Sequence, residues 1–131
     1  MNEEKLLRFI IKLIDMTGRG EIEWDILNGD PDCEPVKMPL KAKLAGYAYE
    51  ASIDSNSFVL FRCRRPIFED GLNPIGWDDY LTYYLTIYDV NNVFRNEISK
   101  SVQHALEDLY EEVQNQIHPA DEIIDRVLSK H

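Results

Sequence analysis

The stretch YYLTIYDVNNVFRNEI, residues 83–98, decides the fold class because it has the pattern of a β-hairpin. Two runs rich in aromatic and β-branched residues flank Asn91-Asn92. Asparagine tolerates positive φ, so this pair predicts a two-residue turn that sets Tyr88 opposite Arg95. Side chains alternate along each strand, so one face of the hairpin is apolar, with Phe94 on it, and the other is mostly polar. The stretch therefore predicts an antiparallel sheet that is covered on one face.

A second hairpin is predicted upstream, from Tyr47–Ile53 and Phe58–Arg65. The DSNS segment between the two runs, residues 54–57, has turn chemistry and would place Ile53 opposite Phe58. The second run begins with four consecutive apolar residues, which predicts a central strand buried on both faces.

Residues 3–17 have helical periodicity and a wide apolar arc, which predicts a first helix covered on more than one side. Residues 21–27 alternate as a strand does, with Trp24 on the apolar face. Segments 28–46 and 66–80 contain several proline and glycine residues and predict long loops.

A second helix is predicted after a serine cap at Ser99 or Ser101, and a short third helix follows the break at His118-Pro119 and ends near Lys130. The order helix, strands, helices predicts a single α+β domain over residues 1–131. We expect an N-terminal helix, a roughly five-stranded, mainly antiparallel sheet built from hairpins, and two C-terminal helices packed on one face.

The chain has 131 residues and a formal charge of −10, with seven acids against two bases in residues 101–131. Such a field repels a phosphate backbone and attracts a basic protein partner, so nucleic acid is not the expected ligand. A solubilising acidic surface is the simpler explanation of the same charge. No apolar stretch approaches the ~20 residues of a membrane span, and charges interrupt the first apolar segment, so neither a membrane protein nor a secreted one is expected.

Motifs that carry catalysis are missing from the sequence, including GxSxG, a glycine-rich phosphate loop and HExxH. The acidic NGDPDCE segment, residues 28–34, does not fit the calcium-loop spacing, and Cys33 and Cys63 form no CxxC pair. We therefore expect no metal, no cofactor and a non-enzymatic role. Two separated cysteines suit reduced thiols in the cytoplasm.

One constellation could bind a ligand: three arginines at the end of a predicted strand, next to two tyrosines on its partner. They are Arg62, Arg64, Arg65, Tyr47 and Tyr49. Guanidinium groups bind carboxylate or phosphate, and tyrosine supplies a flat amphipathic neighbour. The alternative is that the arginines pair with acids of the same chain, such as those at positions 50, 69 and 70.

The segment TGRGEIEW, residues 17–24, follows the apolar first helix, and this beginning resembles that of small bacterial or phage-borne proteins with a G-x-I-x-W strand. The resemblance implies a prokaryotic origin and no activity or site residues. Two functions remain open. The first is a protein-interaction module, such as an inhibitor, an immunity-like protein or an accessory protein. The second is a small-molecule or phosphate-binding domain. A homodimer is also possible through the first helix or an open sheet edge.

Overall fold

A computed structural model of the chain describes residues 3–27, 42–68, 71, 75–88, 93–95, 99–118 and 120–130. Its elements follow the predicted order of one helix, a group of strands and two helices. They are α1 (Glu3–Gly18), β1 (Asp25–Ile26), β2 (Lys43–Leu44), β3 (Tyr49–Ile53), β4 (Asn56–Ile67), β5 (Gly76–Tyr88), β6 (Val93–Arg95), α2 (Lys100–Ile117) and α3 (Ala120–Lys130). The α+β class is confirmed.

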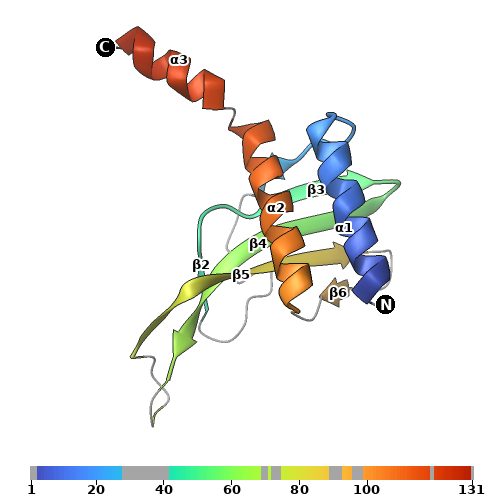
Figure 1. The fold of residues 1–131 in the computed structure, drawn as a ribbon, viewed down its shortest axis with the longest axis vertical. Helices are drawn as coiled ribbons and strands as arrows, with labels where there is room; N and C mark the ends of the chain where they lie inside the picture. Colours follow the sequence, from blue (N-terminus) through green and yellow to red (C-terminus); the bar gives the residue numbers. More distant parts are fainter. Residues whose placement is uncertain are drawn as a thin grey trace.

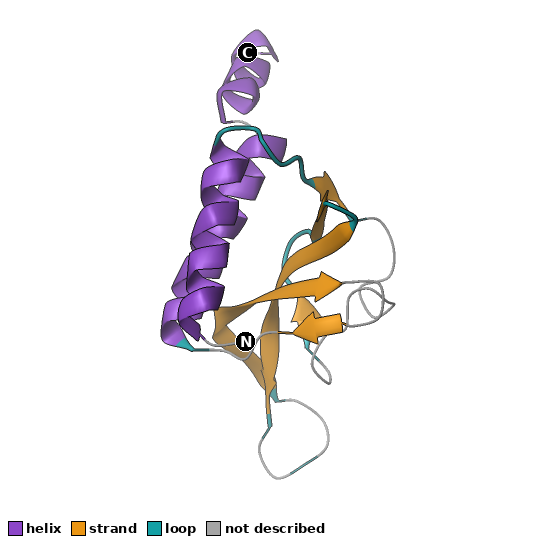
Figure 2. Cartoon of the chain, turned by 90° about the vertical axis from the view of Figure 1, so that its right-hand side faces the viewer, coloured by secondary structure: helices purple, strands orange, loops and turns teal. Residues whose placement is uncertain are grey.

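All pairings in the sheet are antiparallel, in the order β1-β3-β4-β5-β6, and β2 pairs with β4 beyond the end of β3. The apolar strand β4 is central, as its sequence predicts. Helices α1 and α2 lie side by side on one face of the sheet (Figures 1 and 2). The fold therefore has two layers, with its main core between the helix pair and the sheet.

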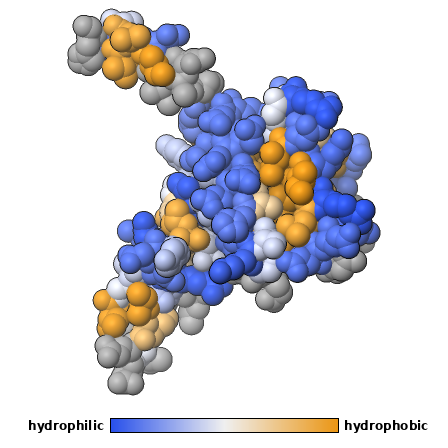
Figure 3. All heavy atoms as spheres, viewed as in Figure 1, coloured by the Kyte–Doolittle hydropathy of each residue, from blue (hydrophilic) through white to orange (hydrophobic). Residues whose placement is uncertain are grey.

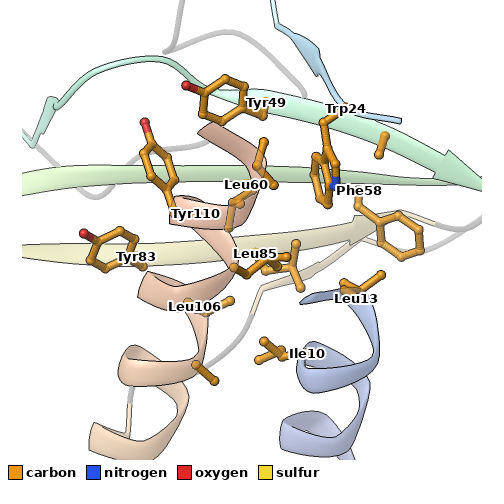
Figure 4. Packing of buried hydrophobic residues seen from close by; sticks show 14 of the residues in the cluster. Ile10, Leu13, Trp24, Tyr49, Phe58, Leu60, Tyr83, Leu85, Leu106 and Tyr110 are labelled. Atoms are coloured by element: carbon orange, nitrogen blue, oxygen red, sulfur yellow. The ribbon is translucent and has the colours of Figure 1, made fainter. Parts of the chain in front are cut away.

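The main core contains aliphatic residues of both helices and aromatic residues of the strands (Figure 4). Ile10 of α1, Leu109 of α2 and Leu60 of β4 are completely buried, and Trp24 is 3% exposed beside them. The wide apolar arc of α1 is thus mainly covered by α2 and the sheet. A smaller cluster on the opposite face of the sheet contains Ala48, Val59, Phe61, Cys63 and Tyr84.

Two glutamines of α2 satisfy backbone groups of other elements. The Gln103 amide accepts from the Tyr83 N–H and donates to the Tyr83 carbonyl, each at 2.8 Å. Gln116 accepts from the Trp24 N–H at 2.8 Å and donates to the Ile22 carbonyl at 2.7 Å. Strand pairing does not use these backbone groups, so the two glutamines satisfy them. The bonds also connect both ends of α2 to the strand layer.

Both predicted hairpin registers are wrong by two residues. In β3–β4, Ile53 faces Asn56, so the turn is Asp54-Ser55 alone, and both residues have positive φ (50° and 72°). In β5–β6, Thr86 faces Arg95, so the connection is longer than the predicted Asn91-Asn92 turn. A shift of two residues keeps every side chain on its predicted face, since the strand period is two.

The predicted loop at 66–80 is wrong at both of its ends, which are strand. Strand β4 continues to Ile67 and β5 begins at Gly76, with Pro66 opposite Trp77. The register shifts between Arg64 and Pro66, and a bulge is a position at which a strand tolerates proline. Similarly, the loop predicted at 28–46 contains the short strand β2, and its residues 28–41 lie outside the described part.

The third helix is where the structure departs from the expected packing. Helix α2 ends at Ile117, and α3 then extends away from the body rather than onto the sheet (Figure 1). All its described side chains, from Ile124 to Lys130, are exposed. The physical reason is that α1 and α2 already cover the helix-facing side of the sheet.

Candidate functional site

The structure brings three of the five candidate binding residues together at one end of the main core. Arg62 of β4 lies over the ring of Tyr110 from α2, with 4.4 Å from its Cζ to the ring centre. Its Nε donates to the Ala45 carbonyl at 3.0 Å. Tyr47 and Tyr49 lie on the neighbouring segment, with ring centres 6.4 Å apart. We call Tyr47, Tyr49, Arg62 and Tyr110 the Arg62 cluster.

Gly46 allows this close approach of backbone and side chains. Its φ is +81°, and a Cβ at this position would lie 3.1 Å from the Tyr110 hydroxyl oxygen and 3.4 Å from Nη2 of Arg62. The Tyr110 hydroxyl then donates to the Tyr47 carbonyl at 2.7 Å. The segment before β3 is therefore held against α2 by one hydrogen bond and one stacked guanidinium.

Aromatic rings form the body of the cluster. The Tyr110 ring lies 5.2 Å from that of Tyr49 and 5.7 Å from that of Tyr83, both edge-on. Figure 4 shows the hydroxyl groups of these three tyrosines on the same side of the core. Tyr47 is 55% exposed, and its ring lies 5.8 Å from that of His118 at the end of α2. Tyr47 is thus the accessible residue of the cluster.

Burial dominates the electrostatics of the two inner tyrosines. It raises the pKa of Tyr110 and of Tyr49, and the positive charge of Arg62 opposes the rise in both. The Tyr49 hydroxyl lies near Tyr110 and Gln114 but makes no hydrogen bond of ordinary geometry with a described residue. In the described part of the chain, no carboxylate lies within 4.0 Å of the Arg62 guanidinium.

Arg64 and Arg65 do not join this cluster. Arg64 donates from Nη1 to the Asp78 carbonyl at 3.0 Å. Arg65 points to the other face of the sheet, where its Nη2 donates to the Tyr84 hydroxyl at 2.9 Å and this bond raises the pKa of Arg65. The alternative of pairing with acids is tested only at position 50, which is not among the observed partners. The observed partners are carbonyl groups and a phenol, while positions 69 and 70 lie outside the described residues.

Two other features are surfaces with exposed apolar residues. The first is an apolar stripe on α3, made of Ile124, Val127 and Leu128, which are 53%, 54% and 71% exposed. We call it the α3 face. The second is at the projecting end of the β4–β5 hairpin, which we call the hairpin arm. Its exposed apolar residues are Ile67, Phe68, Ile75, Trp77 and Tyr80.

An acidic strip lies between these two apolar surfaces. Glu107, Asp108 and Glu111 of α2 are all exposed, and no lysine or arginine follows Lys100 in this helix. Figure 3 shows hydrophobic atoms at the two projecting ends of the molecule, hydrophilic atoms over the helix between them, and a further hydrophobic patch on the body beside that helix. The α3 stripe was visible in the sequence as apolar residues at helical spacing. What the sequence did not show is that no other element covers it.

Among the described residues, no three His, Cys, Asp or Glu side chains gather as a metal site requires. The helices in the described part of the chain are all too short or too polar to cross a membrane. Comparison of the chain with protein-family models, with curated protein sequences and with solved structures finds no match.

Proposed function

We propose that the protein is a non-enzymatic interaction module, of the inhibitor, immunity-like or accessory kind, that binds a basic protein partner. The observation that carries this proposal is the exposure of grouped apolar residues on the α3 face and on the hairpin arm, at the two projecting ends of the molecule. Exposed aromatic and aliphatic residues grouped at projecting ends are typical of protein-binding surfaces. The charge of −10 supports a basic partner through long-range attraction.

We further propose that the protein works in the cytoplasm of a prokaryotic cell. Two cysteines far apart in the chain, outside any CxxC motif, fit a reducing compartment. The resemblance of residues 17–24 to small bacterial or phage-borne proteins supports a prokaryotic source.

Co-purification from the native cell at low and high salt tests the interaction. The tagged chain is expected to retain one or a few basic proteins at low salt, with weaker retention at high salt because exposed charges are screened. Matched capture with an unrelated acidic protein of similar size controls for nonspecific attraction. If the chain retains nothing beyond that control at either salt concentration, the proposal fails.

A second candidate function is binding of a phosphate or carboxylate group at the Arg62 cluster. Two observations favour it: the Arg62 guanidinium has no carboxylate partner among the described residues, and the buried Tyr49 hydroxyl is unsatisfied there. Guanidinium and phenol groups together recognise oxyanions.

A thermal-shift screen with inorganic phosphate, nucleotides and phosphorylated metabolites tests the second candidate. A stabilising ligand should lose its effect on Arg62→Lys, because the bidentate fork is lost while the charge remains. Arg19→Lys is a matched control, because Arg19 is an exposed arginine on α1's C-terminal side that pairs with Asp15. A shift that survives Arg62→Lys, or no shift with any ligand, contradicts binding at this cluster.

A further inference from the structure

The isolation of α3 is the starting point. It has 11 residues, and none of its described side chains is buried. A helix this short is marginally stable in water without tertiary contacts, because nucleation is costly and few hydrogen bonds follow. Its apolar stripe lacks cover from the described part of its own chain. Contact with another molecule would supply the missing stabilisation.

The spacing of the α3 face indicates how it makes contact. Ile124, Val127 and Leu128 follow the pattern i, i+3, i+4, which places them on one side of the helix, and Asp125, Arg126 and Ser129 take the remaining surface. An amphipathic helix of this kind binds by laying its apolar side into a hydrophobic groove. The matching surface on a partner is thus an apolar groove.

The α3 face alone is too small for a stable complex. Three partly exposed side chains cannot supply the roughly 800 Å² per partner that a standard interface buries. The hairpin arm projects from the same side of the body as α3 and adds five apolar residues, including Trp77 and Tyr80 (Figures 1 and 3). Aromatic residues of this type carry a large share of binding energy at interfaces.

The surface between the two apolar contacts selects the charge of the partner. The acidic strip has three exposed carboxylates, whereas α1 beside it has exposed acids and bases in equal number. Helix α2 has 18 residues, is therefore about 27 Å long and lies between α3 and the hairpin arm (Figure 1), so a partner that spans both apolar contacts comes close to the helix that has the strip. A second copy of this chain has the same charge of −10, so long-range electrostatics favour a basic partner over a second copy.

We infer that α3 docks into an apolar groove of a basic protein, which also contacts the hairpin arm and covers the acidic strip with basic residues. This inference rests on the proposed interaction function and specifies its surface. The two apolar contacts and the acidic strip have separate roles in this complex. The two apolar contacts provide most of the affinity, and the strip provides fast association and selection against acidic proteins.

The experiment uses the full chain and the basic protein that co-purifies with it, once identified by mass spectrometry and purified. Calorimetry compares wild type with V127E/L128E, with Trp77→Ala, and with the control Ile11→Glu, which changes a 59% exposed apolar residue of α1. V127E/L128E is expected to raise Kd at least about tenfold, and Trp77→Ala should raise it by a similar factor. The control should leave Kd unchanged. None of these positions is buried, so each variant should fold.

Charge reversal in the strip, E107K/D108K/E111K, gives a different expected result. It should lower the association rate by about tenfold at low salt and flatten the salt dependence of that rate. Hydrogen exchange gives a direct readout for α3, since its amides should become protected in the complex.

Each outcome separates the two proposals. If the basic protein binds wild type and V127E/L128E equally, or if the control loses as much affinity as V127E/L128E, the docking inference is overturned and the interaction function stands. If no protein binds at all, both fail. If sedimentation shows a homodimer that V127E/L128E disperses, the occupant of the α3 face is a second copy and the basic-partner inference is wrong.

Discussion

The side-chain amide of Gln116 forms hydrogen bonds with three backbone groups of α1 and of the segment before β1. It accepts from the Trp24 N–H and donates to the carbonyls of Ile22 and Thr17, the last at 3.3 Å. A glutamine is long enough to reach from α2 to this strand-like segment and has both a donor and an acceptor. Gln116 therefore holds the segment before β1 against α1 and α2, next to the point at which Trp24 enters the core.

Gln116→Ala is expected to lower the free energy of unfolding by about 2 kcal/mol, because partly buried donor and acceptor groups lose their partner. Urea denaturation followed by tryptophan fluorescence measures the change. Asn115→Ala is the matched control, because Asn115 is exposed on the same turn, and it should change the free energy of unfolding by less than about 0.5 kcal/mol. Equal losses in both variants would show that the bridge does not stabilise the fold.

The protonation of Tyr110 makes the free energy of unfolding depend on pH in the alkaline range. Burial raises its pKa, so the folded chain keeps this proton where the unfolded chain, with a tyrosine pKa near 10, releases it. Its contribution is complete below about pH 10 and is lost as the pH rises above that value toward the folded-state pKa. Tyr110→Phe removes this linkage and also the hydrogen bond to the Tyr47 carbonyl.

We therefore expect Tyr110→Phe to be about 1 kcal/mol less stable at pH 8, with a gap that narrows as the pH approaches about 11. Urea denaturation at a series of pH values measures the gap for both chains. Tyr49 also has a raised pKa, so the variant should keep part of the alkaline slope. A gap that stays constant over this range would contradict the linkage.

At the scale of elements, the β3–β4 turn has a backbone that its residues do not favour. Asp54 and Ser55 both have positive φ, the conformation for which a two-residue hairpin prefers Asn-Gly. D54N/S55G should raise the free energy of unfolding by about 0.5 kcal/mol, measured by urea denaturation. Gly46→Ala is the opposing control and should destabilise, because φ is +81° and its Cβ would approach the Tyr110 hydroxyl oxygen. Destabilisation by D54N/S55G would mean that the native side chains stabilise this turn.

These turns explain why the sequence predicted the elements better than their registers. Alternation and helical periodicity identify α1, α2, β4 and the face of each strand residue, because burial follows those periods directly. Turn length depends on which residues adopt positive φ, and Asn91-Asn92 was a better candidate by composition than Asp54-Ser55. Pro66 predicts the start of a loop, but a bulge accommodates it within β4.

The candidate site was predictable only in its strand residues. The cross-strand proximity of Arg62 to Tyr47 and Tyr49 follows from the hairpin. The fourth member, Tyr110, comes from a helix far along the chain, and only tertiary packing brings it there. One signal was present: a tyrosine in an otherwise apolar helix stripe requires an acceptor for its hydroxyl.

For the whole molecule, charge and apolar exposure are distributed unevenly over the helices. Helix α1 has exposed residues of both signs, α2 has the acidic strip, and α3 has exposed apolar residues that no described element covers. The body is thus complete without α3, since its core consists of α1, α2 and the sheet. Stability and binding are expected to reside in different parts of the chain.

Removal of residues 124–131 tests this separation. The described side chains of that segment are all exposed, so the free energy of unfolding should change by less than about 0.5 kcal/mol in urea denaturation. Leu109→Ala, a completely buried position in α2, is the contrasting control and should cost about 2–5 kcal/mol. Amide exchange in the intact free protein should likewise show weak protection in α3 and strong protection in α2. A large loss of stability on truncation would mean that α3 folds back onto the body in solution, and its apolar face would then not be available to a partner.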